Sequence, residues 1–248
     1  MKKLLMLCSF VSVLAVAACG GGGAAGGGDG GKCGGGSGCG GSTENPMAQM
    51  MVDQYKNGTS KASYYVALHK DAKAGQYWEV KSTSEFSGYK SENTDKWQVA
   101  AVTGDGPIVE NFMGSMGIVL AYLIDTSKSA EDAMKTGNVK KAWVGKPGDA
   151  PAEIKIMDIP TGGETGPAPE KNYEDKTEDF TDVEIAGGKW SGKKFWMKMK
   201  DGSMESTTWT ATNGWFNGLI KMESKMAAGT SNMELSKFGE DGKPWLKW

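Results

Sequence analysis

Apolar and polar positions alternate in short runs over most of the chain beyond residue 75, with turn residues between the runs. Alternation with a period of two places one set of side chains on each face of a half-buried strand. Residues 118–124 are apolar throughout, which favours a central strand, although a buried helix has the same pattern. The other strand-like runs are 77–81, 96–102, 108–112, 139–144 and 153–157.

Helical spacing is confined to a few segments. Pro46 suits the first position of a helix and Asn45 suits its N-cap. Residues 129–135 favour one or two further helical turns, and residues 62–74 fit either a helix or a strand. We therefore expect an α+β fold that is mainly β, in which one or two N-terminal helices pack against a curled antiparallel sheet of the meander or half-barrel type.

The strongest hairpin signal is Asn213-Gly214, which lies between two alternating runs. A two-residue loop at this point pairs Trp209 with Gly218, and an aromatic side chain over a glycine helps to fix such a register. This register places Trp209 and Phe216 on the same face of the hairpin.

The preceding turn falls at Lys200-Asp201-Gly202. A two-residue Asp-Gly loop would place Phe195 opposite Trp209, whereas a three-residue loop pairs Phe195 with Thr207 and places both aromatics on one face. Because the hydrophobic pattern specifies register, we expect the three-residue loop. The resulting apolar face, which is either an ordinary core or a ligand groove, comprises Phe195, Met197, Met199, Trp209, Phe216, Ile220 and Met222.

The first residues have the organisation of a secretory signal. Lys2 and Lys3 precede an apolar run over residues 4–16, and two small residues then lead to Cys19. One interpretation is an ordinary secreted protein whose cleavage site adjoins a cysteine.

The segment Val16-Ala17-Ala18-Cys19 also resembles the lipobox of bacterial lipoproteins. The resemblance implies that residues 1–18 are a cleaved signal peptide and that Cys19 carries diacylglycerol and a further acyl chain such as palmitate. Several acyl chains hold a soluble domain on a membrane far better than one. Gly20 after the cysteine implies the outer membrane rather than the inner one, so the resemblance predicts a lipid-anchored protein on the periplasmic side of the cell envelope.

A glycine-rich tether follows the predicted anchor. Fifteen of the 22 residues over 20–41 are Gly, so residues 19–42 should be a lipidated cysteine and a disordered linker, followed by a single β-rich domain over 43–248. Cys33 and Cys39 lie within this linker. In an oxidising compartment they can form a disulfide within the chain or between chains, or remain as two accessible thiols.

Composition argues against a nucleic-acid partner. All 28 basic residues are Lys, 30 residues are acidic, and the formal net charge is −2. Nucleic-acid-binding proteins normally have a basic stripe and use Arg for bidentate contacts. The acidic residues concentrate over 158–184, a segment also rich in Gly and Pro that predicts a solvated surface loop.

Metal sites find little support in the sequence. Oxygen ligands for Ca²⁺ are present in the acidic segment, but the Gly that a calcium loop needs at its sharp turn is absent among them. Met197 and Met199 could bind Cu(I), but alternation places both on the buried face, which favours a role in packing. We therefore expect neither a metal nor a cofactor. The calcium candidates are Glu174, Asp175, Glu178, Asp179 and Asp182.

The sequence also contains little evidence for a catalytic site. His69 is the only histidine, which excludes a Ser-His-Asp triad, a Cys-His pair and a multi-His zinc site. The segments Ser87-Gly-Tyr-Lys90, Ser91-Glu-Asn93 and Lys135-Thr-Gly137 resemble the ordered motifs of penicillin-binding proteins. That family needs its nucleophile at the start of a helix, whereas Gly88 indicates a turn between strands. We therefore expect no enzymatic activity.

Over roughly residues 75–240, the expected layout resembles the lipoprotein-carrier half-barrels of bacterial envelopes. No diagnostic motif accompanies the resemblance, so no functional residue is carried over. Most of the 15 methionines lie in the body, and flexible thioethers adapt to irregular apolar ligands. We expect a non-enzymatic module that binds an apolar ligand or a lipid. The alternative is a structural protein with a closed core that docks another envelope protein.

Overall fold

The computed structural model describes residues 46–159, 172–214 and 218–248. These residues belong to one compact unit, Asn45–Trp248. The described elements are α1 (Pro46–Lys56), β1 (Tyr77–Phe86), β2 (Tyr89–Thr103), β3 (Gly106–Met113), β4 (Ile118–Ile124), α2 (Ala130–Thr136), β5 (Val139–Gly145), β6 (Ala152–Ile154), β7 (Tyr173–Ile185), β8 (Gly188–Met199), β9 (Met204–Ala211), β10 (Leu219–Met226) and β11 (Gly229–Gly239).

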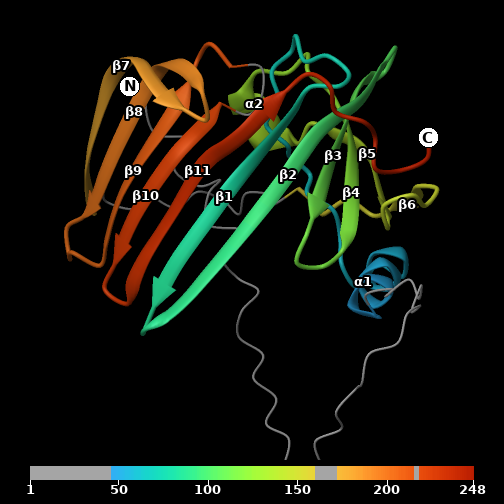
Figure 1. The fold of residues 1–248 in the computed structure, drawn as a ribbon, viewed down its shortest axis with the longest axis horizontal. Coiled ribbons are helices and arrows are strands. Elements are labelled where there is room, and N and C mark those ends of the chain that lie inside the picture. Colours follow the sequence, from blue (N-terminus) through green and yellow to red (C-terminus); the bar gives the residue numbers. More distant parts are fainter. Residues whose placement is uncertain (1–45, 160–171, 215–217) are drawn as a thin grey trace, which may run out of the picture. The chain divides into compact units, whose positions relative to one another are not determined.

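All the described strands form one antiparallel sheet in the order β6-β5-β4-β3-β2-β1-β11-β10-β9-β8-β7 (Figure 1). Strands β1 to β6 are added one after another toward one edge, and the chain then crosses to the opposite edge and returns from β7 to β11 beside β1. The sheet is unclosed, because β6 and β7 end it on opposite sides. The mainly β, antiparallel fold predicted from the alternation is therefore confirmed.

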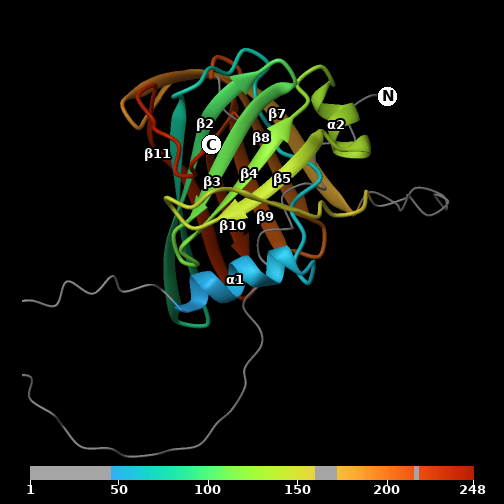
Figure 2. The ribbon, with the colours of Figure 1, turned by 90° about the vertical axis from the view of Figure 1, so that its right-hand side faces the viewer.

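The sheet curls strongly in its C-terminal half. Trp190 of β8 and Phe238 of β11 contact each other with ring centroids 5.1 Å apart, although β9 and β10 lie between their strands. Strand β7 also contacts β11. Such contacts across intervening strands require the sheet to bend toward one side, and Figure 2 shows the strands wrapping in this way. We call the concave side the inner face and the convex side the outer face.

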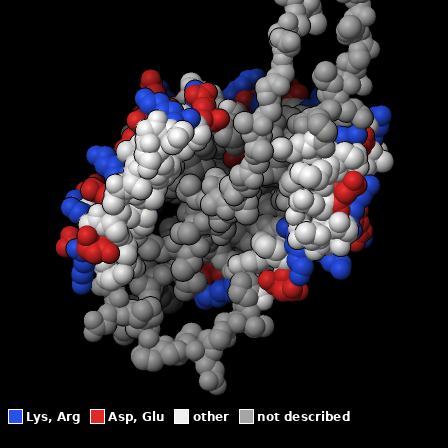
Figure 3. All heavy atoms as spheres, turned by 90° about the horizontal axis from the view of Figure 1, so that it is seen from below, with Lys and Arg blue, Asp and Glu red and all other residues white. Residues whose placement is uncertain are grey.

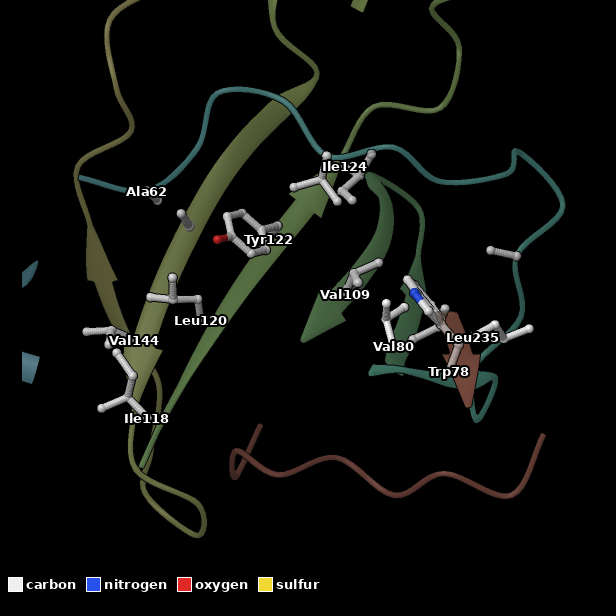
Figure 4. Close-up of a cluster of buried hydrophobic side chains, with 14 of the residues drawn as sticks. Ala62, Trp78, Val80, Val109, Ile118, Leu120, Tyr122, Ile124, Val144 and Leu235 are labelled. Atoms are coloured by element: carbon white, nitrogen blue, oxygen red, sulfur yellow. The ribbon is translucent and has the colours of Figure 1, made fainter. Parts of the chain in front are cut away.

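The main core lies on the inner face and extends from β3–β5 across β1 and β11 to Trp190 of β8 and Ile220 of β10. Val80 and Leu235 are paired across β1 and β11 and are 4 % and 1 % exposed (Figure 4). Helix α1 packs on β4, β5 and β6 and contributes Ala48 and Val52 to this cluster. Tyr122 of β4 belongs to the same core, and its burial raises the pKa of its phenol well above the ordinary range.

A second, smaller core lies on the outer face and is closed by the C-terminal tail. Ala121 of β4 and Leu246 of the tail are both buried in it. Glu110 of β3 is fully buried and connects tail and sheet, because its carboxylate oxygens lie 2.7–3.2 Å from four hydrogen-bond donors. The donors are the Gln98 side-chain amide, the backbone N–H groups of Trp245 and Leu246, and the indole N–H of Trp248.

The prediction of an acidic surface loop over 158–184 is wrong for residues 173–184. Residues 173–185 form the edge strand β7, and residues 160–171 lie outside the described residues. The acidic side chains of β7 alternate between the two faces, opposite the lysines of β8. Asp179 forms an ion pair with Lys193, and Glu178 is paired in register with Lys194. The neighbouring lysine-rich strand thus offsets the charge repulsion that made this segment resemble a loop.

Candidate functional site

A row of serines crosses the inner face of five adjacent strands. The register pairs Ser84 of β1 with Ser91 of β2 on one side and with Ser231 of β11 on the other, and the pairing continues into β10 and β9. Two hydroxyl pairs within the row are hydrogen-bonded, at 2.7 Å and 2.9 Å. We call this set the serine row; its members are Ser91, Ser84, Ser231, Ser224 and Ser206.

The serine row lies on the same side of the sheet as the main core. Ser84 and Ser82 are four and two residues from the core residue Val80 on β1, in a stretch whose pairing with β11 has no bulge. Because side chains two residues apart on a strand share a face, Ser82 and Ser84 point to the inner side. The residues paired with them across the sheet therefore also lie on the inner face.

Methionine and aromatic side chains flank the serine row on both sides. On the core side, the register joins Ser82, Met233, Met222, Thr208 and Phe195. On the side of the hairpin turns, Met226 is paired with Met204, and Met199 ends the strand on the other side of the β8–β9 turn. These residues, together with the serine row and Met197, form one part of the inner side, which we call the methionine face.

The methionine face adjoins the main core through Met233, but its two most buried methionines lie outside both cores. Met197 and Met222 are 5 % and 9 % exposed, yet neither belongs to the core clusters. Helix α1 packs on β4–β6 rather than on β8–β11, and within the described ranges neither helix makes extensive contacts with these C-terminal strands. The face is thus lined by thioethers, hydroxyls and one phenyl ring, without a helix of the described structure packed over it.

Charged side chains gather on the outer face of the same strands. Lys81 pairs with Glu92 at 2.9 Å, and Lys221 pairs with Glu223 at 2.9 Å. Figure 3 shows charged atoms on the outer side of the wall at the left and uncharged atoms on its inner side. Exposed ion pairs of this kind contribute little to stability, so their main consequence is a strong difference in polarity between the two faces.

Among the described residues, register places few charges on the inner side of β2 and the C-terminal strands, and acids outnumber bases among them. By register, Asp175 and Asp179 of β7 share this side with Lys193, and Lys193 forms its ion pair with Asp179. Asp95 of β2 is paired with Val80, and burial raises the pKa of its carboxyl above the ordinary value despite a hydrogen bond from Asn93. The described part of the inner side is therefore neutral to weakly negative.

The structure corrects the expected position of Trp209. The β8–β9 turn has four residues instead of three, because the Asp201 carboxylate accepts a hydrogen bond from the Ser203 N–H at 2.9 Å and draws Ser203 into the loop. Phe195 is consequently paired with Thr208, and Trp209 with Lys194. The one-residue difference places Trp209 on the outer side by register, where the ammonium groups of Lys194 and Lys221 each lie 5.3 Å from the centre of its ring. The Trp209 ring also packs against the edge of the main core.

The expected two-residue turn at Asn213-Gly214 is also wrong. The Asn213 side chain accepts a hydrogen bond from the Ser191 N–H and donates one to the Lys189 carbonyl, so it is bound to β8 instead of closing a tight turn. Strand β10 starts only at Leu219, and a bulge between Leu219 and Lys221 brings Met222 opposite Thr208.

The predicted apolar face is therefore divided by the structure. Phe195, Met197, Met199 and Met222 lie on the inner side of their strands, and Trp209 lies on the outer side. Ile220, at the bulge, is fully buried in the main core. Phe216 lies outside the described residues, as do Cys19, Cys33, Cys39, the signal segment and the linker.

The remaining candidate motifs are not assembled into one site. Ser87 lies in the β1–β2 turn beside Lys90, which forms an ion pair with Glu85, whereas Lys135 lies on α2 at the other end of the unit (Figure 1). Over the described ranges, no three His, Cys, Asp or Glu side chains form a group that could hold a metal ion. None of the described helices is both long and apolar enough to span a bilayer.

Comparison with known proteins gives no family assignment. No family model matches the sequence, and no curated protein matches it. Among solved structures, the chain is similar to MucB, with a TM-score of 0.32 and 10 % identity over 81 % of this chain and 61 % of MucB. The chain thus spans about three fifths of MucB.

Two further similar structures have names that mention lipoproteins. One is a candidate lipoprotein from Parabacteroides distasonis, with a TM-score of 0.29 and 11 % identity over 73 % of this chain and 100 % of that one. The other is a candidate outer-membrane lipoprotein-sorting domain from Vibrio parahaemolyticus, with a TM-score of 0.27 and 9 % identity over 77 % and 92 % of the two chains. At these scores no functional residue is transferred to this protein.

Proposed function

We propose that the protein is a non-enzymatic binding module that holds the acyl chain of a lipid on its methionine face. The single observation that carries the proposal is the contrast between the two faces of β8–β11. Ion pairs cover the outer side, whereas thioethers and Phe195 line the inner side, where the buried Met197 and Met222 belong to neither core. Burying apolar surface is the dominant favourable term in such binding, and flexible thioethers fit chains of irregular shape.

The proposal includes attachment of the protein to a bacterial envelope membrane through a lipid on Cys19. The support is the lipobox-like segment that ends at this residue and the glycine-rich stretch after it. A flexible chain of about 25 residues has a root-mean-square reach of roughly 28 Å, which would hold the binding domain close to the membrane that supplies its ligand.

If Cys19 carries the lipid anchor, its substitution should change the distribution of the protein between cell fractions. Cys19→Ala removes the acceptor of the acyl chains, so the protein should move from the membrane pellet to the soluble or secreted fraction. Cys33→Ala is the matched control, because it also removes one thiol from the same segment and should leave the protein in the pellet. An unchanged distribution of the Cys19→Ala protein would contradict lipid anchoring.

Ligand binding can be measured on the fragment of residues 45–248, which contains both cores and all the described strand pairs. We expect N-phenyl-1-naphthylamine, an uncharged apolar probe, to become fluorescent on this fragment and to be displaced by lipids. Met222→Gln puts an amide on the methionine face and should weaken probe binding about fivefold, which corresponds to roughly 1 kcal/mol.

Glu223→Gln is the control for this substitution, because it places the same side chain on the outer face of the neighbouring position. It should leave probe binding unchanged. Melting curves establish whether both variants are folded. If Met222→Gln does not fold, it is replaced by Met226→Gln, because Met226 is a half-buried residue of the same face near the hairpin turn. Absence of displaceable binding by the folded fragment would overturn the proposal in favour of a structural protein that docks another envelope protein.

A further inference from the structure

Resting on the proposed function, we infer that the ligand is an uncharged amphiphile: one acyl chain with a small hydroxyl-bearing head group, of the monoacylglycerol type. The serine row would hold the head group, and the methionine and aromatic side chains on the core side of the row would hold the chain. The inference names the class of ligand and excludes fatty-acid anions and anionic phospholipids as preferred ligands.

The serine row is suited to a neutral polar group. Each hydroxyl has one donor and two acceptor lone pairs. The hydrogen bonds Ser84–Ser91 and Ser206–Ser224 each use only one of the two hydroxyl protons of the pair. The remaining proton and lone pairs can both donate to and accept from a hydroxyl-bearing head group. An anionic head would use the donors alone and leave the acceptors without partners.

The order of the rows gives the ligand a direction. From the hairpin turns inward, the inner face presents the methionines Met204 and Met226, then the serine row, and then the row that contains Met222 and Phe195. Successive rows are two residues apart on each strand, about 6.6 Å. A head group at the serine row therefore places its acyl chain against the Met222 row, on the way to Val80 and Leu235 of the core.

The charges on the inner side select against an anion. Asp95 and Asp179 lie on this side by register, and among the described lysines Lys193, which register places on the same side, is paired with Asp179. The lysines that flank these positions in the sequence, such as Lys194 and Lys198, point to the outer face. Over the described residues, register places on this side no lysine other than the paired Lys193, so a carboxylate or phosphate at the serine row would meet hydroxyls and carboxylates, which is unfavourable in a partly desolvated site.

The test compares two ligands with the same chain. Oleate and 1-monooleoylglycerol are titrated against N-phenyl-1-naphthylamine bound to the 45–248 fragment at pH 8, where the fatty acid is ionised. We expect the monoacylglycerol to displace the probe with at least tenfold higher affinity. Equal affinities or a preference for oleate would overturn the inference and leave the proposed function intact. Failure of the folded fragment to bind the probe would instead remove the proposed function and this inference with it.

A pair of adjacent substitutions tests the role of the serine row. Ser206→Lys places a cation in the row, whereas Thr207→Lys places the same cation on the outer face, one residue away. Ser206→Lys should raise the affinity for oleate at least tenfold and close or reverse the preference, and Thr207→Lys should leave the preference as it is. Ser84→Lys, at another position of the row, replaces Ser206→Lys if that variant does not fold. An equal effect of the inner and outer lysines would overturn the assignment of the head-group site.

Discussion

Glu110→Ala is expected to lower the free energy of unfolding by about 3–5 kcal/mol, the range typical of removing one partner from a buried, hydrogen-bonded charge network. The Glu110 carboxylate is fully buried and accepts hydrogen bonds from Gln98 and from three donors of the C-terminal tail. Without it, the tail N–H groups lose their acceptor, and Leu246 loses the contact that holds it in the outer core.

Thermal unfolding of the folded domain measures this effect. For a domain of this size, each kcal/mol shifts Tm by about 2–4 °C, so a decrease of roughly 6–20 °C is expected. Glu92→Ala removes a carboxylate from an exposed ion pair with Lys81 and should change stability by less than about 1 kcal/mol. Deletion of residues 245–248 should cost a similar amount to Glu110→Ala and add little to it, because both remove the same contacts. Additive losses would show that Glu110 and the tail stabilise the domain independently.

Gly106→Ala is expected to destabilise the domain by about 3 kcal/mol, because steric overlap adds to the cost of an unfavourable backbone conformation. Gly106 begins β3 with φ of +134°, a value that other residues rarely adopt. A Cβ atom at this position would lie 2.2 Å from the Ile124 carbonyl oxygen, a backbone atom that cannot move away without disturbing β4.

The neighbouring turn residue Gly104 provides the comparison. A Cβ atom on Gly104 would meet no atom within 4 Å, and its φ is not positive. Gly104→Ala should therefore be neutral or slightly stabilising, since it also reduces the conformational freedom of the unfolded chain. Urea unfolding of both variants measures the difference in their free energies of unfolding. Equal midpoints would show that the turn at Gly106 rearranges without a loss of stability.

Local sequence patterns were sufficient to predict several of the helices and strands. The helix expected from Pro46 is α1, the short helical segment near residue 130 is α2, and the apolar run over 118–124 is strand β4, buried along its whole length. These elements were predictable because the helix start and the apolar periodicity are encoded by residues close together in the sequence. Residues 62–74, whose pattern was ambiguous, form neither a helix nor a named strand.

The candidate site was only partly predictable. Alternation determined that Phe195, Met197 and Met199 share a face, because that relation holds within a single strand. It could not determine whether Trp209 shares that face, since this depends on the number of residues in the turn. One hydrogen bond, from the Ser203 N–H to Asp201, accompanies a four-residue turn that places Trp209 on the outer side.

The serine row had no sequence signal. Its members come from five strands, and only the register of four strand pairs brings them into line. A serine on a strand is unremarkable by itself, so the row could be found only once the pairing was known. The same holds for β7, whose acidic residues resemble a loop until the lysines of β8 are placed beside them.

The sequence by itself determined the class of fold, the position of the first helix and the alternation of faces within each strand, because these properties depend on neighbours along the chain. The tertiary structure decided which strands pair, in which register, and what closes each core. Glu110 illustrates the difference, because three of its four hydrogen-bond donors lie about 135 residues further along the chain. Contacts over such separations are set by the packing of the whole sheet, and no local pattern encodes them.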